Sequence, residues 1–176
     1  DCMPMMRIST DEARTWSEPV SCITDTKGYF VLNNNRVVQL KSGRLLMPVA
    51  MHRPSNGKWQ EKGIIYNYYS DNNGASWKCS SAVPNTTDII TQEPGVIELK
   101  DGTIMMFIRA SGGIQQLSYS KDKGETWSHI EPSNINSPLS PASITRVPST
   151  GDLVMVWNNN ARDQKRTPYN IGISKD

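Results

Sequence analysis

The stretch Ser120-Lys-Asp-Lys-Gly-Glu-Thr-Trp127 has the pattern S-x-D-x-G-x-T-W, and it is repeated along the chain. Residues 70–77 carry it with Asn for Asp and Ser for Thr, and residues 9–16 carry it with Ala for Gly. Residues 174–176 match the first three positions, so the initial serines are 61, 50 and 54 residues apart. The Asp or Asn side chain can accept bonds from nearby backbone N–H groups, and Gly can take a positive φ. The pattern predicts a repeated hairpin turn, with the tryptophan folded back as an apolar plug.

A second repeated feature lies upstream of these turns. Three segments, 36–51, 95–109 and 143–157, each have two short apolar runs separated by a turn that contains Gly. Glycine supplies the positive φ that hairpin turns need, so each segment is expected to form a β-hairpin. The nearly continuous apolar run 104–108 indicates a strand that is buried on both faces, between neighbouring sheets.

Composition limits the class of protein. The 176 residues are 36% hydrophobic, which is enough for one domain with a core, and the formal net charge of +2 indicates no nucleic-acid partner. No apolar stretch approaches the roughly 18–20 residues of a membrane span. The N-terminal residues show no signal peptide, so either none was present or it has been removed. The cysteines have no metal-ligand spacing and allow at most one disulfide, and buried free thiols are expected.

The S-x-D-x-G-x-T-W element resembles the Asp-box, or BNR repeat, and over essentially its whole length the chain is similar to the sialidase-like superfamily. The resemblance implies an all-β fold, the six-bladed β-propeller, with four-stranded blades and Asp-boxes between the third and fourth strands. Residues 1–176 would supply about three blades, with boxes near 9–16, 70–77 and 120–127 and a truncated one from 174. Half a propeller would leave unpaired edges. We therefore expect a piece of a longer protein, or a second chain that completes the ring.

The same resemblance implies functions for particular residues. Sialidases have a Glu sixteen residues before an Arg on one hairpin, and Glu93 and Arg109 keep that spacing. Glu93 would be the base-like partner of a tyrosine nucleophile, and Arg109 one of three arginines that hold the substrate carboxylate. Arg166, eight residues before Ser174, would be another of these arginines, although Arg162 and Lys165 compete for that role. The alternative is that Glu93 only caps the hairpin and Arg109 ends a strand in solvent.

Further polar residues would lie at the same edge of the propeller. Carboxamide and aromatic groups suit the hydroxyl and N-acetyl groups of a sugar, so Asn35, Arg36 and Trp157 are candidate substrate-binding residues. His52 is another candidate, but a lone histidine also often satisfies a backbone hydrogen bond. The small residues of 137–143 would let the backbone approach a ligand. No cofactor or metal is implied by the sequence.

Several family features are missing from the chain. It has no Arg-Ile-Pro motif for the first arginine, no convincing acid/base Asp and no nucleophilic Tyr, since Tyr169 stands too early and fits a strand. Pro94-Gly95 stands where family members usually have Cys-Gln or a similar pair. We therefore expect the isolated chain to be inactive.

The resemblance favours an exo-α-sialidase-like glycoside hydrolase that removes terminal sialic acids with retention, and its partner would be a sialylated glycan. Alternatives are a hydrolase of the same fold for another sugar and a non-catalytic carbohydrate-binding propeller. An extracellular or periplasmic location is also implied by the resemblance alone.

Overall fold

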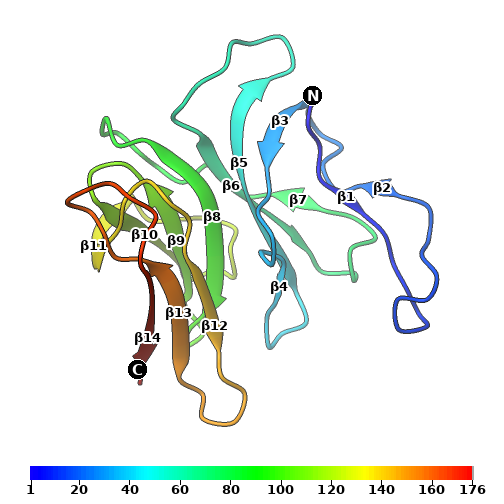
Figure 1. Ribbon diagram of the computed structural model, residues 1–176. Helices are drawn as coiled ribbons and strands as arrows, with labels where there is room; N and C mark the ends of the chain where they lie inside the picture. Colours follow the sequence, from blue (N-terminus) through cyan, green and yellow to red (C-terminus); the bar gives the residue numbers. More distant parts are fainter. Residues whose placement is uncertain (176) are drawn as a thin grey trace.

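The computed structural model describes residues 1–175, and strands are the regular secondary structure of this part of the chain (Figure 1). They form four antiparallel sheets that follow one another along the sequence. Among residues 1–175 no helix is long and apolar enough to cross a membrane. The sheets contain, in order, β1 (Met5–Met6) and β2 (Val20–Ser21); β3 (Gly28–Val31), β4 (Val38–Gln39), β5 (Leu45–Pro54), β6 (Ile64–Ser70) and β7 (Lys78–Cys79); β8 (Thr91–Glu98), β9 (Ile104–Ala110), β10 (Ile114–Ser120) and β11 (Glu131–Asn136); and β12 (Ser143–Arg146), β13 (Leu153–Asn158) and β14 (Tyr169–Ser174).

The second, third and fourth sheets have the strand order of propeller blades. The third sheet is a complete meander, β8-β9-β10-β11. In the second sheet β3 and β4 pair with opposite parts of β5, so together they form one interrupted inner strand. The first strands of the successive blades converge, and β12 lies against β8. The three predicted hairpins are confirmed as β4–β5, β8–β9 and β12–β13, and their turn glycines Gly43, Gly102 and Gly151 have φ of 89°, 86° and 77°.

The Asp-boxes form the predicted turns. In the third box, Asp122 accepts hydrogen bonds from the Thr126 backbone N–H at 2.9 Å and from the Ser120 hydroxyl at 2.7 Å. The Ser120 hydroxyl in turn accepts a bond from the Gly124 N–H at 2.8 Å. The second and third boxes connect β6 to β7 and β10 to β11, between the third and fourth strand positions. The fourth copy includes Asp176, which lies outside the described residues.

The tryptophans of the boxes differ in burial, and the prediction of an apolar plug is wrong for Trp16. Trp127 is buried in a core cluster and Trp77 packs against another, whereas Trp16 is 54% exposed. The later boxes pack on the preceding blade: a Cβ at Gly124 would meet Leu46, and one at Gly74 would meet Met6. Within residues 1–175 no preceding blade is present for the first box to pack on.

The core lies between the blades. Ile104, Met106 and Ile108 of β9 are fully buried against the second blade, and Phe107 packs on the other side of β9 against Ala142 and Met155. This confirms the prediction that the run 104–108 is buried on both faces. The cysteines are free, and Cys2 is exposed rather than buried because it lies at the start of the chain, on an isolated bridge.

Polar contacts also join consecutive blades. The buried Asn67 side chain donates a hydrogen bond to the Gly124 carbonyl at 3.0 Å. Arg44 bonds Asp71 at 2.7 Å and Glu125 at 2.8 Å, and its guanidinium lies 4.4 Å from the centre of the Tyr69 ring. The third Asp-box is therefore fixed to the second blade.

Candidate active site

The local fold directs Glu93 into the site. Gln92 pairs with Arg109 and Pro94 pairs with Ile108, so Glu93 is the extra residue of a β-bulge in β8. Its φ of 40° is unusual for a residue with a side chain. Bulges of this kind turn a side chain away from the alternation of the strand, and strained backbone is often found at functional sites.

Glu93 and Arg109 form an ion pair. Their carboxylate and guanidinium groups lie 2.8 Å apart, and their side chains are 19% and 15% exposed. The alternative that Arg109 ends its strand in solvent is therefore wrong. Glu93 Oε2 and Arg109 Nε are buried and make no hydrogen bond. Buried polar groups usually have partners, so these two atoms indicate a place for a polar ligand.

Arg36 approaches this pair from another blade. It is buried, and its guanidinium donates a hydrogen bond to the Ala142 carbonyl at 2.6 Å. It also lies over the Phe107 ring, 5.2 Å from the ring centre. Burial lowers the pKa of Arg36, and the negative charge of Glu93 acts in the opposite direction. Arg36 Nε has no partner either, so three charged side chains of this region have spare hydrogen-bonding capacity.

Gly95 makes this arrangement possible. A Cβ at residue 95 would lie 2.3 Å from the tip of the Phe107 ring, so the ring occupies the space of a side chain. The ring in turn supports Arg36. Gly95 thus leaves room for the aromatic ring on which the buried Arg36 lies.

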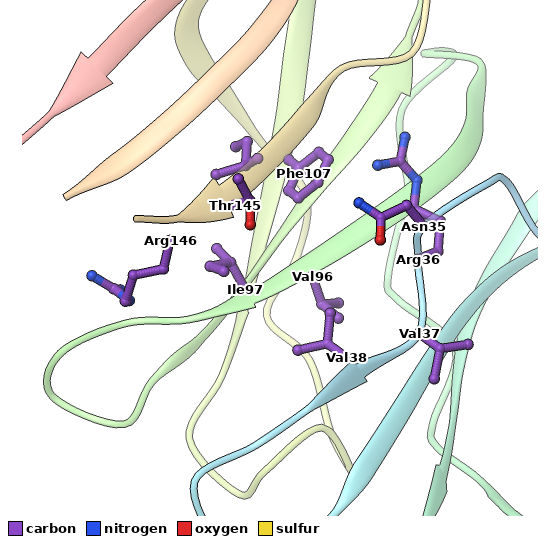
Figure 2. A pocket seen from close by; sticks show the side chains of 10 residues that line it. Asn35, Arg36, Val37, Val38, Val96, Ile97, Phe107, Thr145 and Arg146 are labelled. Atoms are coloured by element: carbon purple, nitrogen blue, oxygen red, sulfur yellow. The ribbon is translucent and has the colours of Figure 1, made fainter. Parts of the chain in front are cut away.

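Two cavities lie on either side of Arg36. One has a volume of about 270 Å³ and is lined by residues of β4, β8 and β12 and by Phe107 of β9 (Figure 2). In this view Asn35 and Arg36 lie at one side of the cavity and Arg146 at the other. The second, of about 250 Å³, lies between residues 33–36 and 141–143.

The remaining candidate residues differ in exposure and in the groups that they contact. Asn35 is exposed, at a turn with a φ of 56°, and lines the larger cavity. Arg166 is exposed and bonds the Leu139 carbonyl at 3.2 Å, so it contacts the same loop as Arg36. Buried Gln115 holds that loop by bonds to Ser137 and Ser140. Tyr169 begins β14, as the sequence predicts.

His52 and Trp157 are both engaged in contacts within the fold. The buried His52 ring bonds the Gln60 carbonyl at 2.8 Å through Nδ1, which makes it a donor there, and it stacks on Trp59. The Trp157 indole donates to the Asn136 carbonyl at 3.0 Å, and its ring lies on Gly172 of β14. Trp157 thus packs between two blades, and we leave it out of the proposed site.

Phe107, Gly95 and Trp59 are parts of this region that were not predicted from the sequence. Glycine inside an apolar strand is a signal of close approach, and this could have identified Gly95. Among the described residues no group of three or more His, Cys, Asp or Glu could hold a metal ion.

The fold and the site define an Asp-box β-propeller with an arginine-rich centre. The model of the BNR repeat-like domain matches residues 1–176, and the chain belongs to this family, within the sialidase superfamily. It is 29% identical over 180 residues to a sialidase of Bacteroides fragilis, covering 96% of this chain and 31% of the relative. It is 31% identical over 144 residues to a sialidase of Paraclostridium sordellii, covering 75% and 34%. The solved structure of a Hadza microbial sialidase has a TM-score of 0.79 at 20% identity and covers 98% of this chain and 34% of its own. The chain thus spans about a third of the length of the curated relatives it matches.

Proposed function

We propose that this chain forms part of an exo-α-sialidase-like glycoside hydrolase that removes terminal sialic acids from glycoconjugates with retention. The observation that supports it most is the partly buried Glu93–Arg109 pair, which a β-bulge brings together and which keeps two buried atoms without hydrogen-bond partners. The names of the relatives support the same class of reaction.

The proposed binding step uses the arginines. A guanidinium is always charged and can bond both oxygens of a carboxylate, as the carboxylate of a sialic acid requires. Arg109 and Arg36 supply two such groups close to Glu93, and Arg166 supplies a third from the loop after β13. Asn35 contributes a carboxamide for sugar hydroxyl groups.

The proposed chemical step uses Glu93 as the base. A tyrosine from outside these residues would lose its phenolic proton to Glu93, whose Oε2 is free to accept it. The tyrosine oxygen would then bond to the anomeric carbon as the glycosidic bond breaks, and an aspartic acid outside these residues would protonate the leaving oxygen. Water would release the sugar by the reverse proton transfers, which gives overall retention.

One observation favours a second candidate, a hydrolase of the same fold for another sugar. The Phe107 ring over Gly95 and the Arg36 stack alter the wall next to Glu93, so the pocket can differ from that of the relatives in the sugar it accepts. An acidic sugar would still be required by the two arginines.

The test is release of a fluorogenic leaving group from an α-linked sialic acid by the full-length protein. We expect activity, and a loss of at least 100-fold in kcat/KM for Arg109→Ala, because about 3 kcal/mol of charge-assisted bonding is lost. Arg14→Ala, an exposed change in the first Asp-box, is the matched control and should be as active as the parent. A folded but inactive parent would reject the sialidase proposal and direct the assay to other acidic glycosides. The proposed location outside the cytoplasm is tested separately, by detecting the protein in cell fractions.

A further inference from the structure

An exposed aromatic side chain lies beside the candidate active site. Trp59 is in the β5–β6 loop, and 48% of its surface is exposed. This loop projects at the end of the blades where β8 begins (Figure 1). Exposed large apolar side chains at a functional edge are commonly binding surfaces, provided that they are held in place and lie close to the site.

Trp59 is held by two aromatic contacts. Its ring is stacked on His52, with the ring centres 4.8 Å apart and the planes 11° from parallel. Tyr29 makes an edge-type contact at 5.1 Å. Its indole N–H also bonds the Glu61 carboxylate at 3.2 Å. The side chain is therefore already ordered, which reduces the entropy cost of binding a ligand.

The support under Trp59 is itself fixed. His52 is buried, and its ring bonds the Gln60 carbonyl while its backbone carbonyl accepts a bond from the Gln60 N–H at 2.8 Å. The buried His52 ring therefore supports one face of the Trp59 ring.

The loop is joined to the residues immediately before Glu93. The Gln92 side chain donates to the Glu61 carbonyl at 2.9 Å. The Gly63 N–H donates to the Thr91 carbonyl at 2.8 Å, and the Thr91 hydroxyl donates back to the Gly63 carbonyl at 3.0 Å. Trp59 is two residues before Glu61, whose carbonyl accepts the bond from Gln92. Two residues of chain span about 7 Å at most, so the Trp59 backbone lies a short distance from this contact.

We propose that Trp59 is a stacking platform for the pyranose ring of the sugar next to the one held at Glu93 and Arg109. One face of a pyranose presents C–H groups, which match the electron-rich face of an indole. This proposal rests on the proposed function, because the position of the neighbouring sugar is defined by the sialic acid in the arginine site.

Equilibrium binding by the full-length protein tests the platform with two probes, free sialic acid and the trisaccharide sialyllactose. We expect Trp59→Ala to weaken trisaccharide binding about tenfold, or about 1.4 kcal/mol, and to change sialic acid binding by less than twofold. Trp59→Tyr should restore most of the loss, since it keeps an aromatic face. Trp16→Ala is the matched control, because Trp16 is similarly exposed but lies in an Asp-box.

The outcomes separate the two proposals. If Arg109→Ala abolishes binding of both probes and Trp59→Ala changes neither, the arginine site stands and the platform is rejected. If Trp59→Ala weakens both probes equally, Trp59 belongs to the sialic acid site and the platform is again rejected. If the parent binds neither probe, both proposals are rejected. A melting temperature for each variant confirms that the loss of binding is not a loss of folding.

Discussion

Substituting Gly95 by alanine should damage both the fold and the candidate site. The new methyl carbon would lie 2.3 Å from the tip of the Phe107 ring, whereas carbon atoms pack at about 3.5–4.0 Å. The ring must therefore move by about 1 Å or more. Phe107 is buried against Ala142 and Met155, so the ring can move only by displacing these neighbours or Arg36.

The expected cost follows from this geometry. Overpacking of a filled core costs about 1–3 kcal/mol, and we expect about 2 kcal/mol from the free energy of unfolding. The displaced ring would no longer support the Arg36 guanidinium, and a partly buried cation–π contact is worth about 1–2 kcal/mol. Ligand affinity should therefore fall about tenfold, even though residue 95 has no polar side chain in either variant.

Urea unfolding and ligand titration of the same variant measure the two effects. Gly43→Ala is the matched control, because Gly43 has a φ of 89° and a Cβ at this position would meet no atom within 4 Å, so its cost comes from the backbone alone. Phe107→Leu removes the ring tip, and combined with Gly95→Ala it should be more stable than the sum of the single changes predicts. If Gly95→Ala costs less than about 0.5 kcal/mol, or if the double variant shows no such coupling, the reasoning is refuted.

Three further predictions concern the scaffold. Asp122→Asn should lower neutral-pH stability by about 1 kcal/mol, because an amide can keep the bonding pattern, as Asn72 does in the second box, but not the extra strength of bonds to a carboxylate. Burial opposes ionisation of Asp122, but hydrogen bonds outweigh it and lower its pKa to about 2. The contribution of the ionised Asp122 to folding stability is therefore present above about pH 4 and is lost as the pH falls towards 2. Acid unfolding of Asp122→Asn should not show this loss. Arg44→Met should cost about 1–2 kcal/mol by urea unfolding, because it removes the pairing with Glu125 across two blades, and a cost independent of salt would contradict an ionic origin. The isolated 176-residue chain should self-associate in light scattering and should not hydrolyse sialosides. Ile171→Lys should reduce the association, because Ile171 is 73% exposed on β14. A soluble monomer at high concentration would contradict this prediction.

Part of the site could be predicted from the sequence, because it depends on a single hairpin. The sixteen-residue spacing places Glu93 and Arg109 on paired strands, but Arg109 pairs with Gln92, and it is the bulge at Glu93 that brings the two charged groups together. Arg36 could be picked out only as a candidate. Its partner Ala142 is 106 residues away, and nothing in the local sequence indicates that distance. Trp59 gave no signal at all, since an exposed loop tryptophan looks the same whether or not a histidine lies beneath it.

The sequence by itself determined the Asp-boxes and the hairpin turns, because their bonds join residues at most five positions apart. The hydrogen bond between Asp122 and Thr126 forms within one short turn, and the chain can reverse at Gly102 because glycine allows a positive φ. Only the tertiary structure decided which box tryptophan is buried, since Trp127 has a preceding blade to pack on and Trp16 has none within the described residues. The same holds for the contacts of Arg36 with Phe107 and Ala142, because contacts between blades depend on how the sheets pack and not on any local pattern.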